Sequence, residues 1–231
     1  MRSPPPRRIG TTGVRRDIRP PPAAPGSALK QTLLTTLCLV ASIAPAGELG
    51  PTIDEVAGDR LELLHSTTDW RIFSITIAAG GTLADHATGP RAIVTLTGLE
   101  IQALKGDADP TTAKPWQAMW LTNTFSRGFE NIGDETLSYL VIEARDRDIQ
   151  AEDSDRGCDV GETLLTNSEL SICRIGERSS GLTIELSRPS WLYSPAPLMA
   201  ADGDSQIALP IGTHTLRPAS SPVVVVELGP D

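Results

Sequence analysis

The sequence FSITIAAGGTLADHATGPRAIVTLTGLEI (73–101), followed after a polar insert by WLTNTFSRGFENIGDETLSYLVIEAR (120–145), decides the fold. Both stretches hold short apolar runs separated by glycines, which is typical of short strands joined by tight turns. Turns are expected at Ala79–Gly81 and Asn131–Glu135, and Lys105–Pro115 has the composition of a solvated hairpin loop. The expected strands are Arg60–His65, Trp70–Ala78, Asp85–Thr88, Arg91–Leu96, Leu99–Leu104, Trp116–Leu121 and Leu137–Glu143.

The composition agrees with an all-β chain. Of 231 residues only 4% are aromatic, whereas 20 are glycine and 19 are proline, which favours many short strands over long packed helices. The formal net charge is −9, but the first 46 residues hold seven basic side chains and one acidic one. The remainder therefore carries 13 basic and 28 acidic side chains. Such an acidic domain repels phosphate backbones, so we expect no nucleic-acid partner.

A weaker second copy of the pattern follows the first. The acidic segment Arg145–Thr163 has no periodicity and is interpreted as a linker. The ending TLRPASSPVVVVELGP (215–230) aligns with FENIGDETLSYLVIEA (129–144) at an offset of 86 residues, or 87 if Arg127 is matched to His214. The predicted organisation is an N-terminal segment (1–46), a first domain (47–146), a linker (147–162) and a shorter second domain (163–231).

The N-terminal segment is predicted to be an export signal preceded by an extension rich in proline and arginine. Basic residues precede an apolar run at Thr32–Ile43, and Ala44-Pro45-Ala46 supplies the small residues that precede a signal cleavage site. The run is too short to span a bilayer core of roughly 30 Å, so no stable membrane anchor is expected after cleavage. Because Cys38 lacks the small residue that precedes a lipidated cysteine, we expect no lipoprotein. These features predict a periplasmic or secreted protein cleaved after Ala46.

Two cysteines remain after cleavage, Cys158 and Cys173. In an oxidising compartment they are able to close a disulfide loop that stabilises the fold by about 3 kcal/mol. The alternative, two unpaired thiols, stays open because the sequence does not fix the distance between them.

The ordered motifs of the first domain resemble those of a known superfamily. Gly80, five intervening residues, His86 and then Gly98 resemble the first cupin motif, and Arg127 with Asn131 before an LVIE strand resembles the second. The resemblance covers roughly residues 60–145, and the weaker repeat makes the whole chain similar to a bicupin. It implies an all-β fold, the double-stranded β-helix or jelly-roll barrel, in two tandem copies of which the second is shorter and degenerate.

The resemblance also locates the metal-ligand positions of cupins, which are two histidines and a glutamate in the first motif and a histidine in the second. These positions fall on His86, Thr88, Arg91 (or Ala92, depending on the direction of counting) and Arg127. Transition metals need three or four imidazole, thiolate or carboxylate ligands, whereas arginine is always charged and only donates hydrogen bonds. We therefore expect no bound metal and no other cofactor.

The same positions predict a site for a small anionic or hydroxylated ligand. Arg91 and Arg127 are suited to bind a carboxylate, sulfate or phosphate bidentately, and alternation along the strand gives His86 and Thr88 the same face. His86 is also a possible proton carrier. Two alternatives remain open: the arginines pair with nearby carboxylates such as Asp85 or Glu130 and close the barrel structurally, and His86 is a structural strand residue.

Aromatic side chains are a second possible lining of the cavity. On a regular strand Trp116 and Trp120 share a face, as Trp191 and Tyr193 do in the second copy. Core or interface packing explains these residues equally simply and is the interpretation that we favour.

Four functions are compatible with these observations. The favoured one is an exported small-molecule-binding protein without a metal centre and without turnover. The alternatives are a metal-independent isomerase or epimerase that uses His86 with Arg127, an atypical metal-dependent dioxygenase, and a structural protein whose barrel is filled by side chains. GxSxG, Walker, HExxH and CxxC motifs do not occur in the sequence. A homodimer is possible by analogy with the fold.

Overall fold

The computed structural model describes residues 50–123, 125–146, 149, 152, 154, 157–178, 180–195, 206–216 and 220–228, which belong to one compact unit of the chain, residues 40–231. The predicted signal segment, with Cys38 and the cleavage site, lies outside the described residues. Where the chain is described it is mostly β-structure, as predicted, and none of its helices is long and apolar enough to cross a membrane.

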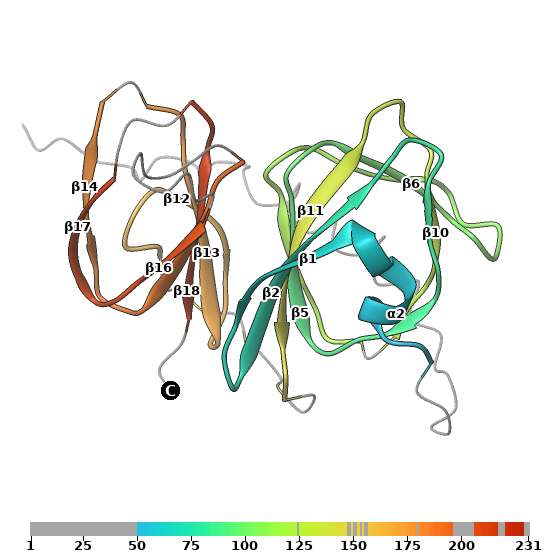
Figure 1. Cartoon of the computed structure of the whole chain (residues 1–231), viewed down its shortest axis with the longest axis horizontal. Helices are drawn as coiled ribbons and strands as arrows, with labels where there is room; N and C mark the ends of the chain where they lie inside the picture. Colours follow the sequence, from blue (N-terminus) through green and yellow to red (C-terminus); the bar gives the residue numbers. More distant parts are fainter. Residues whose placement is uncertain are drawn as a thin grey trace, which may run out of the picture. The chain divides into compact units, whose positions relative to one another are not determined.

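The first copy is drawn from cyan to yellow in Figure 1. It contains a five-stranded sheet of order β1-β2-β11-β5-β8, a four-stranded sheet of order β3-β10-β6-β7 and the pair β4-β9. Its strands are β1 (Leu61–Ser66), β2 (Trp70–Ile77), β3 (Thr82–Leu83), β4 (His86–Ala87), β5 (Arg91–Thr95), β6 (Leu99–Ala103), β7 (Thr111–Ala113), β8 (Ala118–Leu121), β9 (Phe125–Ser126), β10 (Phe129–Asn131) and β11 (Leu137–Ala144).

The second copy, drawn from tan to red in Figure 1, repeats the large sheet and has a smaller partner. Its five-stranded sheet has the order β12-β13-β18-β15-β16, and β14 pairs with β17. The strands are β12 (Glu162–Thr166), β13 (Leu170–Ile175), β14 (Leu182–Leu186), β15 (Ser190–Tyr193), β16 (Gln206–Leu209), β17 (Gly212–Leu216) and β18 (Val223–Leu228). All strand pairs of both copies are antiparallel, as expected of jelly rolls.

Each large sheet buries both of its faces, which explains why its central strand is apolar almost throughout. On β11, Tyr139 and Val141 face the interior of the first copy, together with Phe73. On the opposite face Leu140 and Ile142 join a core that also contains residues of the second copy. The second-copy members of this shared core are Leu170, Ile172, Trp191, Val224 and Val226.

A short helical segment packs into the first copy ahead of its strands. Helix α2 (Ile53–Ala57) buries Ile53 and Ala57 among the interior side chains and is followed by the 3₁₀ turn η2 (Gly58–Arg60). The segment is fixed by an ion pair between Asp54 Oδ2 and Arg71 Nη1 at 2.7 Å. This helix therefore covers part of the interior that holds the candidate site.

The turns of the two motifs form as expected. Gly80 has a φ of +71°, a backbone conformation that favours glycine. The Asn131 side chain donates to the carbonyl oxygens of Ile77 (3.0 Å) and Glu135 (2.9 Å), and so ties the second motif to the end of β2. In contrast to the expected loop, the insert at 105–115 contains a short strand, β7, which pairs with β6.

Candidate functional site

A buried carboxylate, Glu143, is the centre of the polar interior of the first copy. It lies on β11 directly between Arg71 on β2 and Arg91 on β5, and it is 5% exposed. Its Oε1 accepts hydrogen bonds from the Gly89 backbone N–H (2.6 Å) and from Thr88 Oγ1 (3.0 Å), and its Oε2 accepts one from Arg71 Nε (2.5 Å). Because Arg71 is the donor, the last of these is a charge-assisted hydrogen bond.

Gly89 makes this arrangement possible because the backbone approaches β11 closely. A Cβ at this position would lie 2.7 Å from the carbonyl oxygen of Ala144 and 3.4 Å from the Glu143 side chain. Any other residue would push the turn away from the strand, and Glu143 would lose the Gly89 N–H.

Arg91 is a buried cation without a carboxylate in direct contact. It is 4% exposed, and its hydrogen bonds to described residues all leave from Nη1, to the carbonyl oxygens of Gly89 (3.1 Å) and Asn123 (3.1 Å) and to Asn123 Oδ1 (3.4 Å). Among described residues no ion pair includes Arg91. Burial lowers the pKa of Arg91 to about 10, against the opposing effects of Glu143 and Tyr139, so the side chain is still charged at neutral pH.

His86 is buried near Arg91 and is neutral at pH 7. Burial lowers its pKa, the hydrogen bond with Ala84 opposes this shift, and the positive charge of Arg91 adds to it. The Nδ1 atom lies 2.9 Å from the Ala84 carbonyl oxygen, which only accepts. The neutral ring therefore carries its proton on Nδ1 and keeps the Nε2 lone pair as an acceptor.

Tyr139 adds a phenol to the same face of the sheet. Its side chain is 6% exposed, and burial raises the pKa of its hydroxyl while Arg91 and Arg60 lower it. The hydroxyl makes no hydrogen bond with any described residue. Neither Tyr139 nor Glu143 was predicted, since both lie in a strand whose sequence is mainly apolar. Alternation was the available signal, because both share parity with the interior residue Val141.

Of the four predicted ligand-binding residues, the structure brings three together. His86, Thr88 and Arg91 are all buried around Glu143, whereas Arg127 lies by Asp85. The pairing of His86 with Ser126 places Arg127 opposite Asp85, on the other face of the β4-β9 pair.

The electrostatics of Asp85 agree with this placement of Arg127. The pKa of Asp85 is lowered mainly by Lys105 and the Gly128 N–H, with a smaller contribution from Arg127. Lys105 Nζ lies 2.5 Å from Asp85 Oδ2. The ion pair found at Asp85 is thus with Lys105, and Arg127 adds only a smaller electrostatic contribution.

The donor set of the first copy does not fit a transition metal. Among the described residues buried in this copy, His86 and Glu143 are the only imidazole and carboxylate, and both oxygens of Glu143 already accept hydrogen bonds. Across the described residues no three His, Cys, Asp or Glu side chains form a group able to hold a metal ion.

The four aromatic residues predicted as a possible cavity lining belong to the shared core and not to the interior of the first copy: Trp116, Trp120, Trp191 and Tyr193. Trp116 and Trp120 pack partly buried against this core, and Trp70 contacts Trp120 edge to face with ring centroids 6.4 Å apart. Trp116 precedes β8 with a φ of +62°, so the expectation that it lies on a regular strand was wrong. Trp191 and Tyr193 share a face as predicted, and their rings stack at 5.9 Å.

The second copy has a carboxylate at the equivalent position. Glu227 on β18 lies between Ser171 on β13 and Ser190 on β15, as Glu143 lies between Arg71 and Arg91. This register places the two carboxylates 84 residues apart, so the offset of 86 or 87 from the sequence was wrong. The last residues of β11 and β18, Ala144 and Leu228, have the same separation.

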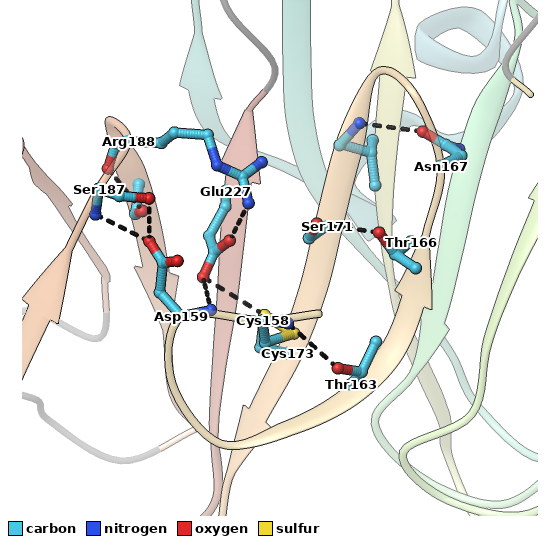
Figure 2. Close-up of polar contacts among 12 residues, drawn as sticks. Cys158, Asp159, Thr163, Thr166, Asn167, Ser171, Cys173, Ser187, Arg188 and Glu227 are labelled. Atoms are coloured by element: carbon cyan, nitrogen blue, oxygen red, sulfur yellow. Dashed lines mark hydrogen bonds and ion pairs between the residues drawn. A yellow bond between two sulfur atoms is a disulfide. The ribbon is translucent and has the colours of Figure 1, made fainter. Parts of the chain in front are cut away.

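Glu227 is neutralised by its own copy. It is fully buried, and its Oε2 accepts a hydrogen bond from Arg188 Nη2 at 2.5 Å (Figure 2). His214, the predicted counterpart of Arg127, bonds instead through Nε2 to the Pro210 carbonyl oxygen at 2.8 Å. The structure also contains a disulfide between Cys158 and Cys173, with Cα atoms 5.9 Å apart.

The fold is the double-stranded β-helix, or jelly roll, that the resemblance to cupins predicts, and it is present in two copies. No protein-family model matches the chain, and no curated protein sequence matches it. Among solved structures, AerE from Microcystis aeruginosa is similar, with a TM-score of 0.53 and 12% identity over 74% of this chain and 93% of that one.

Two further structures are similar to a smaller degree. The protein Ylba from E. coli has a TM-score of 0.45 and 11% identity over 80% of this chain and 88% of that chain. A cupin domain from Bordetella pertussis has a TM-score of 0.34 and 12% identity over 43% of this chain and 100% of that chain. The AerE match is longer than either copy, so it includes both. At this identity it shows the fold alone.

Proposed function

We propose that the chain is an exported small-molecule-binding protein, and that the interior of the first copy binds an anionic or hydroxylated ligand through Arg91, without a metal. The single observation that carries the proposal is Arg91 itself, a 4% exposed cation whose Nε and Nη2 make no hydrogen bond with any described residue. Arginine presents these two nitrogens in a planar fork that matches a carboxylate, sulfate or phosphate.

Neighbouring groups complement such a ligand. The neutral His86 offers an acceptor at Nε2, and Tyr139 offers a hydroxyl that has no described partner. A hydroxylated anion satisfies an arginine, an acceptor and a phenol at the same time, whereas a simple cation is repelled by Arg91. The bound molecule is therefore expected to carry a negative charge next to hydroxyl groups.

A second candidate is a metal-independent isomerase or epimerase. The observation that favours it is the neutral His86, whose lowered pKa and fixed Nδ1–H leave Nε2 as a proton acceptor. A His86→Gln variant that still binds the ligand with the same affinity distinguishes this enzyme from a protein that only binds. Under this alternative such a variant loses turnover of the ligand, and under the favoured proposal no turnover exists to be lost.

The binding proposal is tested by a thermal-shift screen with sulfate, phosphate, citrate, gluconate and glucose. At a hundredfold excess over Kd a ligand stabilises the folded state by about 2.7 kcal/mol, which is readily seen as a higher Tm. We expect at least one anion to raise the Tm of the wild type and of the control Arg174→Met. Arg174 is a half-buried arginine of the second copy, paired with Glu162.

The variant Arg91→Met is expected to lose this increase. An increase of equal size in Arg91→Met contradicts the proposed site. If no anion or hydroxylated compound raises the Tm of the wild type, the result favours an interior filled by side chains and a structural role.

Export is part of the same proposal and rests on different observations. The apolar run at Thr32–Ile43 precedes Ala44-Pro45-Ala46, and the disulfide belongs in an oxidising compartment. Expression in a bacterial host followed by fractionation and N-terminal sequencing is expected to give a periplasmic protein that begins at Gly47. An uncleaved protein in the cytosolic fraction contradicts export.

A further inference from the structure

The five residues Gly157–Gly161 form a strap across the interior of the second copy. Cys158 and Val160 pack against its buried apolar side chains, which include Cys173, Leu186 and Leu192. The strap therefore covers the same interior that contains the Arg188–Glu227 ion pair.

Hydrogen bonds besides the disulfide hold the strap, one of them from the Cys158 backbone N–H to Thr163 Oγ1 at 3.2 Å. The Asp159 backbone N–H donates to Glu227 Oε1 at 3.0 Å, and Asp159 Oδ2 accepts hydrogen bonds from the Ser187 N–H (2.8 Å) and Oγ (2.6 Å), as Figure 2 shows. Ser187 and Asp159 are both exposed, so water competes for two of these hydrogen bonds.

The C-terminal end of the strap is fixed more tightly. Gly161 has a φ of +83°, and a Cβ there would lie 2.4 Å from the Arg174 carbonyl oxygen. This close approach to β13 anchors the strap where β12 begins, and the disulfide ties the strap to β13 near its other end. Opening at Cys158 is therefore possible without separating the strands.

The two sulfur atoms have different surroundings. Cys173 on β13 is fully buried, whereas Cys158 on the strap is half-buried. Cys173 Sγ lies 3.6 Å from Glu227 Oε1. In the disulfide this is a contact without a hydrogen bond, because the sulfur carries no proton. In the reduced protein the same geometry allows the Cys173 thiol to donate to the carboxylate.

We propose that the Cys158–Cys173 disulfide is a dithiol-sensitive clasp, and that its reduction through Cys158 releases the strap from the Arg188–Glu227 pair while the second copy stays folded. An external dithiol attacks as its thiolate. A bond forms to Cys158 Sγ, the disulfide bond breaks, and the electron pair goes to Cys173 Sγ, which takes up a proton.

The second thiol of the reagent completes the reaction. It attacks the mixed disulfide, closes to the cyclic disulfide and releases Cys158, which is also protonated. The protein disulfide gains two electrons and the dithiol is oxidised by two. In the reduced pair Cys158 is half-buried and Cys173 is fully buried, so a reagent reaches Cys158 more easily. Cys158 is thus the reactive thiol of the reduced pair.

The first test is the rate of alkylation by iodoacetamide in two single variants, read by peptide mass spectrometry so that Cys38 is counted separately. We expect Cys158 in Cys173→Ser to react at least about tenfold faster than Cys173 in Cys158→Ser, since exposure and thiolate character govern the rate. Equal rates, or a faster reaction at Cys173, contradict the assigned direction of attack.

The second test uses the wild-type full chain, oxidised and then reduced with dithiothreitol, and compares amide hydrogen exchange. Exchange is expected to increase by at least about tenfold in peptides covering 157–161, while those of β13 and β18 remain protected, because local openings need only part of the global free energy. Two results overturn the clasp: unchanged exchange at 157–161, or equal loss of protection in β13 and β18.

Discussion

The two copies contain the same five-stranded sheet with a buried carboxylate on its central strand, but the partners of this carboxylate differ between the copies. In the second copy Glu227 is paired with Arg188, and strap and disulfide lie over both. In the first copy Glu143 is held by Arg71, Thr88 and Gly89, and a second arginine, Arg91, stays charged nearby without a carboxylate in direct contact. In the second copy Arg188 neutralises the buried carboxylate. In the first copy Arg91 is a buried cation whose Nε and Nη2 make no hydrogen bond with any described residue.

One position accounts for much of this difference. The register that aligns Glu143 with Glu227 also aligns Arg91 with Ser190, and the residues two positions earlier are Gly89 and Arg188. Arg188 supplies the charge that neutralises Glu227. Gly89 supplies only a backbone N–H, and its lack of a side chain lets the turn approach β11. Gly89 of the first copy therefore occupies the position that Arg188, the arginine that neutralises Glu227, has in the second copy.

The largest expected effect is a difference in the free energy of unfolding between variants of the two buried arginines, Arg188 and Arg91. Arg188→Met removes the cation that pairs with the buried Glu227, which is expected to reduce the free energy of unfolding by about 3–5 kcal/mol. Arg91→Met removes a desolvated cation that has hydrogen bonds but no ion pair among described residues. Its cost is expected to stay below about 1.5 kcal/mol, because relief of desolvation offsets the lost hydrogen bonds. Urea unfolding of both variants measures the difference.

The matched control replaces both members of the second-copy pair. Arg188→Met combined with Glu227→Leu is expected to recover most of the lost stability, since no buried charge is then left alone. If Arg91→Met destabilises the protein as much as Arg188→Met, Arg91 is a structural cation and the contrast between the copies disappears.

A smaller effect concerns pH and the first copy. Burial lowers the pKa of His86 below its unfolded value near 6.5, so the folded state resists protonation. The stabilisation that comes from keeping His86 neutral is complete above pH 6.5. It is lost as the pH falls from 6.5 through the lowered pKa of the folded state. The wild type is expected to have a lower urea midpoint at pH 5 than at pH 7, and His86→Gln to show a smaller difference. An equal difference in the variant would assign the pH dependence to other groups.

The fold was accessible from the sequence because its signals are local. The run Ala79-Gly80-Gly81 forms its turn, and Asn131 ties the second motif to the end of β2 through its side chain. The predicted strands Trp70–Ala78 and Leu137–Glu143 form as β2 (Trp70–Ile77) and β11 (Leu137–Ala144).

The site was only partly predictable because it depends on pairing between distant strands. His86, Thr88 and Arg91 were identified by their motif positions, but Glu143 is a charged residue near a strand end and resembles a solvent-exposed one. Its burial follows from the register with Arg71 and Arg91, which the sequence does not contain. The prediction for Trp116 was wrong for a related reason. Its positive φ takes it out of the regular strand, and alternation along the sequence does not indicate this.

The most direct test of the central claim observes the Arg91 guanidinium itself. Nitrogen–proton correlation spectra resolve Nε–H groups of buried arginines, and the Arg91 signal is assigned by its disappearance in Arg91→Lys. Titration with the anion that raises the Tm is expected to shift the Arg91 signal and to leave that of Arg174 in place. An Arg91 signal that does not move while the anion binds contradicts the proposed site.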